Sequence, residues 1–213
     1  MPPRILIVAG EPSGDLRGAE LVAALAALEP GVSLIGVGGE RMRAAGVELV
    51  HDITEIAVTG FVEVLRGLPR FRRVFRDVVR AARARRPDAA VLIDFPGFNL
   101  KLAGKLCALG IPVIYYISPQ LWAWLPRRVK AMARSVNKVI VIFPFEEAFY
   151  RRAGIPVEFV GHPLVDALKP QKSPEEFRRL HNVGAGEKVV ALLPGRPVQQ
   201  PDRARRLAQD RLE

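Results

Sequence analysis

The sequence predicts an α/β protein built on an open, doubly wound parallel sheet of the Rossmann-like kind. Strand-length apolar runs alternate along the chain with helix-length amphipathic stretches, which is the order expected of a sheet with crossover helices. The runs are continuously apolar rather than alternating between apolar and polar residues, as is typical of strands buried on both faces. With 213 residues, of which 49% are hydrophobic, the chain is long enough to bury a sizeable core.

The first half of the chain supplies three expected strands and two expected helices. Residues 4–10 (RILIVAG) and 32–39 (VSLIGVGG) are apolar runs that end in glycine, and residues 16–28 between them are rich in Ala and Leu. Apolar residues at 71, 74, 75, 78, 79 and 82 follow helical spacing and predict one buried helix face. Residues 89–95 (AAVLIDF) form the third apolar run.

The second half continues the same alternation. Residues 164–187 are polar and predict a connector with one short helix, in which Ser173 is the cap and Pro174 opens the first turn. The remaining expected helices are 98–109, 126–134 and 144–153, and the remaining expected strands are 111–118, 137–143, 157–161 and 188–195.

These elements divide the chain into three parts. Residues 1–166 are expected to form the Rossmann-like domain, and residues 167–195 a linker with the start of a second domain. After Gly195 the composition changes abruptly, because residues 196–213 hold five arginines and almost no large apolar residues. We therefore expect an aberrant, disordered tail there.

The composition also bears on where the protein works. No apolar run approaches the roughly 20 residues that span a bilayer, and the N-terminal stretch has too short an apolar core for a signal peptide. The lone cysteine, Cys107, cannot form an internal disulfide. We therefore expect a cytoplasmic protein in a reducing compartment. His51, His162 and His181 are far apart in the sequence, and we expect neither a metal nor a cofactor.

The glycine-rich segment GEPSGD, residues 10–15, follows the first expected strand. Ligands bind beyond the carboxyl ends of the strands in an open α/β sheet, so this segment is placed to line a site. Gly10 and Gly14 permit a tight turn, and the start of the following helix suits a phosphate or a sugar hydroxyl. The segment matches neither the Walker motif nor GxGxxG. The alternative interpretation is that Ser13 or Asp15 simply caps the helix.

Asp94 ends the expected strand 89–95 and lies between aromatic residues. Partial desolvation there makes a carboxylate more basic, which suits a general base. The alternative is a strand-end carboxylate that is hydrogen-bonded to a neighbouring turn. A Pro-Gly pair follows and predicts a turn, after which Asn99 is expected to cap the next helix.

A third candidate segment is SPQLWAW, residues 118–124, which follows another strand end. Ser118, Gln120 and Trp122 are placed to line a sugar or acyl pocket. The alternative is that the tryptophans only pack a helix onto the sheet, since aromatic residues are more often core than pocket.

The net charge of +10 comes mostly from residues 66–86, which hold nine arginines against one acid, Asp77. Such a density predicts an anionic partner. No RNP, helix-turn-helix or zinc-finger pattern occurs, so nucleic acid is the less favoured partner and none is expected. Apolar side chains beside arginines suit an anionic lipid surface instead. The residues expected at that surface are Phe61, Val62, Leu65, Arg66, Leu68, Arg70, Arg72, Arg73 and Arg76.

Seven motifs occur in order with the expected gaps, and together they resemble one family. They are VAGEPSGD, GVGGERMRAAG, TGFVEVL, IDFPGFN, YYISPQLWAW, FPFEEAFY and FVGHPLVD. The family that they resemble is lipid-A-disaccharide synthase, a bacterial glycosyltransferase, and the resemblance covers residues 4–195. It implies a GT-B architecture, in which two Rossmann-like domains face each other across a cleft, and it makes residues 1–166 the acceptor-side domain.

The resemblance also implies a reaction. The donor is UDP-2,3-diacylglucosamine and the acceptor is 2,3-diacylglucosamine 1-phosphate (lipid X). The products are a β-1,6-linked disaccharide 1-phosphate and UDP, with inversion and without a metal. Such enzymes are peripheral on the inner face of the inner membrane, which accounts for the basic, apolar segment.

The resemblance assigns roles to individual residues. Asp94 matches the family's proposed general base, which takes the proton from the attacking 6-hydroxyl. The residues that match cleft-lining positions are Gly10, Glu11, Ser13, Gly14, Asp15, Asn99, Ser118, Gln120 and Trp122.

One departure concerns the second domain. The family has Leu-Pro-Gly-Ser-Arg near the donor diphosphate, whereas this chain has LLPGRP, so Arg196 is that arginine displaced by one position. The sequence after Gly195 is expected to resemble nothing in the family, and most of the donor domain is expected to be missing from this chain. We therefore expect an N-terminal half with little activity alone. The alternative function is a non-catalytic module that binds anionic membrane or RNA through its arginines.

Overall fold

A computed structural model of the protein describes residues 2–53, 61–119, 126–184 and 186–191, and for 61–68 and 126–128 it describes the backbone alone. Within these residues one parallel sheet has the strand order β3-β2-β1-β4-β5-β6-β7. The strands are β1 (Arg4–Ala9), β2 (Ser33–Gly38), β3 (Glu48–Asp52), β4 (Ala89–Ile93), β5 (Val113–Tyr116), β6 (Lys138–Val141) and β7 (Val157–Phe159). The prediction of an open, doubly wound parallel sheet is confirmed.

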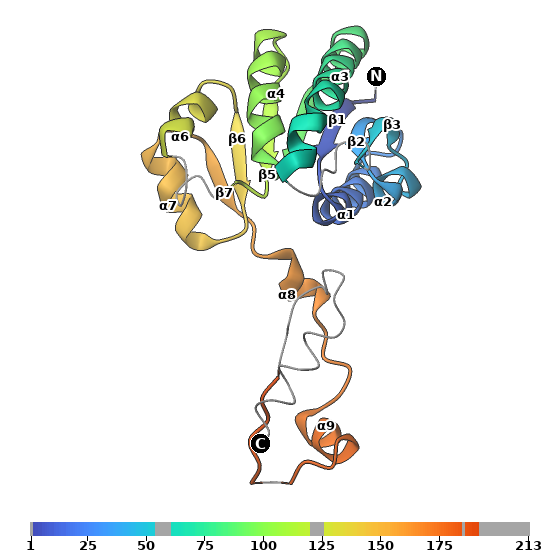
Figure 1. Cartoon of the computed structure of the whole chain (residues 1–213), viewed down its shortest axis with the longest axis vertical. Coiled ribbons are helices and arrows are strands. Elements are labelled where there is room, and N and C mark those ends of the chain that lie inside the picture. Colours follow the sequence, from blue (N-terminus) through green and yellow to red (C-terminus); the bar gives the residue numbers. More distant parts are fainter. Residues whose placement is uncertain (1, 54–60, 120–125, 185, 192–213) are drawn as a thin grey trace. The chain divides into compact units, whose positions relative to one another are not determined.

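Helices cover both faces of the sheet (Figure 1). One face packs against α1 (Pro12–Leu28) and α2 (Glu40–Ala44). The other packs against α3 (Phe61–Arg85), α4 (Pro96–Ala108), α6 (Pro126–Ala133) and α7 (Pro144–Arg152). Neighbouring side chains of a strand point to opposite faces, so Ile7 packs with the first group of helices and Leu6 with the second.

Local chemistry accounts for where several helices begin. Pro12, Pro96 and Pro144 are the first residues of α1, α4 and α7. The missing N–H of a proline costs nothing there, because the first N–H groups of a helix have no partner within it.

The arginine-rich segment forms one helix, α3, and its apolar stripe is buried as predicted. Val74, Val78 and Ala82 are fully buried on this stripe, while Phe71, Phe75 and Val79 are partly buried against the same core. The stripe therefore fixes which side of α3 faces the sheet, and leaves the arginines from Arg70 onward on the outside.

Three short elements were not predicted, and one predicted strand is wrong. The edge strand β3 (Glu48–Asp52), helix α2 and helix α8 (Pro163–Ala167) lack long apolar runs, because each is short and largely on the surface. The strand expected at 188–195 is not formed in its described part, Lys188–Ala191. A strand exists through its ladder partners, and an apolar run without one is left as irregular chain.

The chain separates into two compact units, Met1–Ala167 and Leu168–Glu213. The first contains the sheet. The second contains α9 (Pro174–Leu180), whose cap is Ser173, since its side-chain oxygen accepts a hydrogen bond from the backbone N–H of Glu176 at 3.2 Å. The predicted start of this helix is confirmed.

Candidate active site

The carboxyl ends of β1 and β4 form the point where the sheet changes direction. From β1 the chain proceeds outward through β2 and β3, and then returns to β4 on the other side of β1. Ala9 pairs with Ile93 at the end of the two strands, so Gly10 and Asp94 follow side by side. Open α/β sheets bind their ligands at such a point.

Asp94 lies on a strained turn. Its φ is +44° and the φ of Phe95 is +49°, so two consecutive residues with side chains adopt the left-handed conformation. The carbonyl oxygen of Asp94 accepts hydrogen bonds from the Tyr115 hydroxyl at 2.6 Å and from Asn99 Nδ2 at 2.9 Å. These two bonds hold the turn and therefore fix the direction in which the Asp94 side chain leaves the strand.

Asn99 has a different structural role from the predicted one. Helix α4 begins at Pro96, with Phe95 as its N-cap, so Asn99 lies inside the helix and the cap prediction is wrong. Its side chain reaches back to the end of β4, where Nδ2 also donates to the carbonyl oxygen of Ile93 at 3.1 Å. The prediction failed because Pro96, expected in a turn, is the first residue of the helix.

The carboxyl group of Asp94 is half-buried, and its surroundings make it more basic. Burial raises the pKa of Asp94 above its ordinary value of 3.8, the Glu11 carboxylate raises this pKa further, and the backbone N–H of Phe95 opposes both. A carboxylate with a raised pKa is a better proton acceptor at neutral pH. Glu11 and Asp94 therefore lie close enough for their charges to interact, so the loop after β1 (residues 10–15) and the Asp94 turn are neighbours at the candidate site, which we call the crevice.

Tyr115 is a residue of this site that the sequence did not single out. Its side chain is fully buried, and burial raises the pKa of the hydroxyl well above 10.0, with the Asp94 carboxylate adding to the rise. The hydroxyl therefore stays protonated and remains a donor to the Asp94 carbonyl oxygen across the neutral range. The signal that could have identified Tyr115 is the alternation of side chains along β5. This alternation turns Tyr115 toward α4 and Tyr116 toward the opposite face of the sheet.

Gly10 lies in very close contact with another part of the protein, the ring of Phe95. A Cβ on Gly10 would lie 2.2 Å from Cδ1 of Phe95, so no side chain fits there unless the ring moves. A Cβ on Gly14 would meet Cβ of Ala9 at 3.2 Å, which is a milder conflict. Gly10 therefore allows the loop after β1 to pack against the turn that carries Asp94.

Asp15 neither caps its own helix nor reaches solvent. It is buried, and its Oδ1 accepts hydrogen bonds from the backbone N–H groups of Gly39 at 2.6 Å and Met42 at 3.1 Å. Its Oδ2 accepts one from the backbone N–H of Arg41 at 3.2 Å. The carboxylate therefore caps the neighbouring helix α2, and joins the loop after β1 to the loop after β2.

The start of α1 is on the surface beside this crevice. Glu11 is the N-cap residue and makes no side-chain cap hydrogen bond, and Ser13 follows in the first turn. Both side chains are exposed. Capping of α1 by Ser13 or Asp15, the alternative interpretation of this segment, is therefore wrong.

Ser118 lies inside the protein at the end of β5. Its side chain is buried, and its hydroxyl donates to Oε1 of Glu146 at 3.3 Å. Next to it, the Tyr150 hydroxyl donates to the carbonyl oxygen of Pro119 at 2.9 Å. Burial raises the pKa of Tyr150 to about 12, with Ser118 opposing this rise. These bonds tie the segment after β5 to α7.

Several predicted site residues lie outside the described part of the chain. Gln120, Trp122 and Arg196 are among them, and the side chains of Phe61, Val62, Leu65, Arg66 and Leu68 are not described. Their roles stay predictions.

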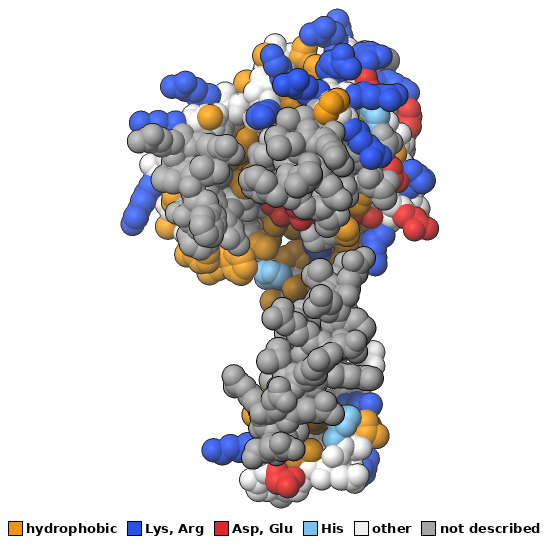
Figure 2. Space-filling model, in the orientation of Figure 1, with side chains coloured by type: hydrophobic (Ala, Val, Ile, Leu, Met, Phe, Trp, Pro, Cys, Tyr) orange, Lys and Arg blue, Asp and Glu red, His pale blue; other side chains and the backbone are white. Residues whose placement is uncertain are grey.

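The outer side of α3 is densely basic. Arg70, Arg72, Arg73 and Arg76 are exposed, and Figure 2 shows Lys and Arg side chains gathered over the part of the molecule where the end of α3 lies. Asp77, which lies among these arginines, bonds Nε2 of His51 at 3.1 Å and Nη2 of Arg80 at 2.5 Å. The His51 bond is the main cause that lowers the pKa of Asp77.

The described residues offer neither a metal site nor a membrane-spanning helix. No group of three or more His, Cys, Asp or Glu side chains there is arranged to hold a metal ion. No helix in the same part of the chain is long and apolar enough to cross a membrane.

Comparison with known proteins gives a consistent family match. Residues 5–202 match the family model described as Lipid-A-disaccharide synthetase. The chain is 46% identical over 212 residues to a lipid-A-disaccharide synthase of Myxococcus xanthus, covering 100% of this chain and 55% of that protein. It is 48% identical over 192 residues to the enzyme of Geobacter sulfurreducens, covering 90% and 50%. The chain thus spans about half the length of the curated relatives it matches.

Solved structures share the fold at low sequence identity. A UDP-GlcNAc 2-epimerase from Neisseria meningitidis, bound to UDP-GlcNAc, matches with a TM-score of 0.54 and 11% identity over 77% of this chain and 47% of its own. Medicago truncatula UGT71G1, complexed with UDP-glucose, matches with a TM-score of 0.50 and 13% identity over 84% and 56%. At such identities the likeness concerns the fold alone.

The comparisons correct one prediction about the C-terminal segment. The family match continues past Gly195 to residue 202, and the Myxococcus alignment takes in the whole chain. The expectation that residues 196–213 resemble nothing in the family is therefore wrong, because composition alone is a poor guide to the relatedness of a short polar segment.

Proposed function

Because the chain belongs to the lipid-A-disaccharide synthetase family, we propose that it forms the acceptor side of an inverting glycosyl transfer. The donor is UDP-2,3-diacylglucosamine and the acceptor is 2,3-diacylglucosamine 1-phosphate (lipid X). The acceptor's 6-oxygen forms the new bond to the anomeric carbon while the bond to UDP breaks, and UDP leaves with that electron pair. The product is the β-1,6-linked disaccharide 1-phosphate.

The observation that carries this proposal is the environment of the Asp94 carboxyl. The hydroxyl proton of the acceptor must go to a base as the oxygen attacks. Asp94 is half-buried at the switch point of the sheet, its pKa is raised, and its turn is fixed by bonds to the backbone. A positioned, partly desolvated carboxylate is suited to take that proton.

The other predicted site residues receive roles of different kinds. Glu11 and Ser13 are exposed beside Asp94 and are proposed to contact substrate, and Glu11 also keeps Asp94 basic. Buried Asp15 and Asn99 are proposed to position the loops, since their side chains bond the backbone. Gln120, Trp122 and Arg196 keep the proposed substrate contacts that the resemblance implies, with Arg196 at the donor diphosphate.

We propose that the same protein is cytoplasmic and binds the inner face of the inner membrane. The exposed arginines of α3 support this, because both substrates are anionic lipids that reside in a membrane. The chain spans about half of its relatives, and a transition state assembled between two domains needs both. We therefore expect little turnover by this chain alone.

To test this proposal, the chain is joined to the remaining half of the Myxococcus xanthus relative, and disaccharide formation by the joined protein is measured. The joined protein is expected to be active, and Asp94→Asn is expected to lower kcat by at least about hundredfold, the range for a lost general base. Glu40→Gln is the control, since Glu40 is an exposed carboxylate on α2. Activity near the wild-type level in the Asp94 variant, with unchanged substrate binding, would contradict the proposal.

A further inference from the structure

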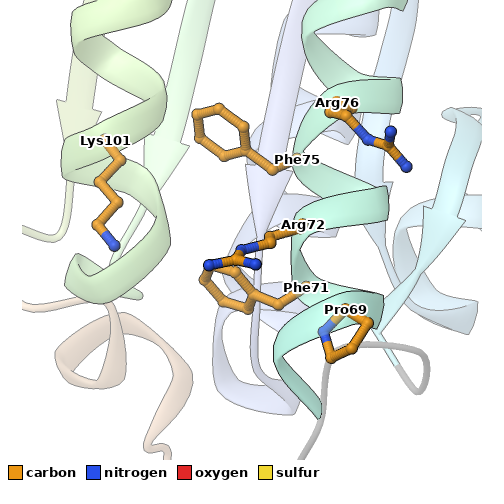
Figure 3. Close-up of a pocket in the computed structure, with 6 residues that line it drawn as sticks. All are labelled: Pro69, Phe71, Arg72, Phe75, Arg76 and Lys101. Atoms are coloured by element: carbon orange, nitrogen blue, oxygen red, sulfur yellow. The ribbon is translucent and has the colours of Figure 1, made fainter.

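A groove of about 510 Å³ lies between α3 and α4, outside the residues assigned above to the transfer step. The residues that line it are Pro69, Phe71, Arg72, Phe75, Arg76 and Lys101. Figure 3 shows Phe71, Phe75 and Arg72 reaching from α3 into the space beside α4, while the Lys101 side chain runs along α4. Arg76 points away from α4 in this view, so Arg72 of α3 and Lys101 of α4 are the lining cations used in the proposal.

The groove combines an aromatic wall with positive charge. Phe71 and Phe75 pack edge-on against Phe98 of α4, with ring centroids 5.0 and 5.5 Å apart, so their positions are fixed by the core. Among the described residues that line the groove, none is acidic. A guanidinium and an ammonium group beside fixed apolar rings suit an anion that is attached to an apolar body.

The groove is connected to the Asp94 turn through ring contacts. The Phe71 and Phe95 centroids are 6.2 Å apart, and Phe95 directly follows Asp94. Phe95 also stacks on Phe98 at 5.7 Å. Through these ring contacts the aromatic wall of the groove continues to the turn that carries Asp94.

We propose that this groove binds the phosphate of the acylated sugar acceptor, with Arg72 on one side and Lys101 on the other. The assignment rests on the proposed function, in which a hydroxyl of that acceptor reacts at Asp94. The aromatic wall contacts the apolar part of the same molecule. The groove thereby selects a phosphorylated acceptor over the same sugar without phosphate.

Lys101 allows a clean test, because it lies on α4 and is not itself among the residues expected at the membrane. The whole chain is titrated with a short-acyl 2,3-diacylglucosamine 1-phosphate in neutral detergent, and with the same lipid lacking phosphate. Lys101→Gln is expected to weaken binding of the phosphorylated lipid about tenfold and to leave the other lipid unaffected. Lys105→Gln, an exposed lysine one turn along the same helix, is the matched control and is expected to change neither.

Two further variants and one vesicle measurement keep the outcome decisive. Arg72→Gln is expected to give a similar loss, and Lys101→Arg is expected to restore binding. Vesicles that contain phosphatidylglycerol are expected to bind the Lys101→Gln and Lys105→Gln variants alike. If Lys101→Gln weakened vesicle binding as much as it weakened acceptor binding, the groove assignment would be overturned. Lys101 would then belong to a general membrane-binding surface.

The failure of this inference can be told from the failure of the proposed function. If the wild type binds the phosphorylated lipid but Lys101→Gln and Lys105→Gln bind it equally well, the groove assignment is overturned and the Asp94 proposal stands. If the wild type shows no preference for the phosphorylated lipid, the groove assignment is overturned on the binding data alone. If it binds neither lipid, both proposals are overturned.

Discussion

The crevice at the ends of β1 and β4 and the arginine face of α3 use polar side chains in opposite ways. In the crevice, the carboxylate of Asp15 and the side chains of Asn99 and Tyr115 are buried and bond backbone groups. On α3, the arginines whose side chains are described are exposed, and Arg73, Arg80 and Arg85 among them pair with an acid. The difference teaches that the crevice groups determine the shape of the site, while the α3 groups act through their charge.

The largest expected effect comes from removing the charge of the exposed arginines on α3. Replacement of Arg72, Arg73 and Arg76 by Gln is expected to lower affinity for anionic vesicles about hundredfold, because each basic residue near such a surface contributes about 1 kcal/mol. The free energy of unfolding is expected to change by less than about 0.5 kcal/mol, as for exposed sites generally. Co-sedimentation and urea unfolding measure the two quantities.

The control for that experiment removes the same charge elsewhere. A triple variant to Gln at Lys105, Arg134 and Arg152, which are exposed and lie outside α3, is expected to keep most of the vesicle affinity. An RNA gel shift that depends on Arg72, Arg73 and Arg76 would instead favour the alternative function as an RNA-binding module.

The next largest effect is expected at Asp15, whose buried carboxylate bonds the backbone. Asp15→Ala is expected to lower the free energy of unfolding by about 3 kcal/mol, because three backbone N–H groups lose their acceptor and two of them are buried. Urea unfolding measures this loss, and Asp15→Asn, which keeps an acceptor oxygen, is expected to lose less. Equal, small losses in both variants would show that Asp15 does not hold the α2 loop.

A smaller loss is expected at Tyr115. Tyr115→Phe removes the donor to the Asp94 carbonyl oxygen and is expected to cost about 1–2 kcal/mol in unfolding free energy, since that oxygen keeps only the Asn99 bond. Tyr116→Phe is the control on the opposite face and is expected to cost less. In the joined protein, Tyr115→Phe is expected to lower kcat more than it raises KM, because the base is misplaced. A change in KM alone would argue against a positioning role.

The smallest effect has the opposite sign. The pKa of Asp94 is higher in the folded protein than in the unfolded chain. Asp94 therefore lowers the free energy of unfolding as the pH rises above about 3.8, because ionising this group is less favourable in the folded protein. Asp94→Asn removes the ionised, partly buried carboxylate and is therefore expected to raise the free energy of unfolding by about 0.5 kcal/mol at pH 7. Unfolding at pH 7 and at pH 3 measures the difference, which is expected to vanish at the lower pH. A variant that is less stable at pH 7 would contradict this account.

The sequence predicted the sheet well because the apolar runs are strong, local patterns. Continuous runs such as residues 4–10 need burial on both faces, and the stripe of α3 fixes its own orientation. It predicted the edge strand β3 and the strand at 188–195 badly, because strand formation there depends on a partner that local pattern does not reveal.

The sequence predicts Asp94 and the 10–15 segment at one edge of the sheet, and they lie there because parallel strands β1 and β4 end side by side. The functional roles of these residues stay predictions, and the sequence did not reveal the hydrogen bonds around them. The bonds of Asp15 to α2 and of Tyr115 to the Asp94 carbonyl join residues over 20 positions apart. Such contacts depend on the register of neighbouring strands, and a single sequence does not specify that register.

Direct titration of the Asp94 carboxyl by carbon NMR in this chain tests the central claim, that the crevice makes this group a stronger base. The account predicts a midpoint clearly above 3.8 that falls when Glu11 is changed to Gln, because burial and the Glu11 charge both raise the pKa of Asp94. A midpoint at or below 3.8, unaffected by Glu11→Gln, would contradict it.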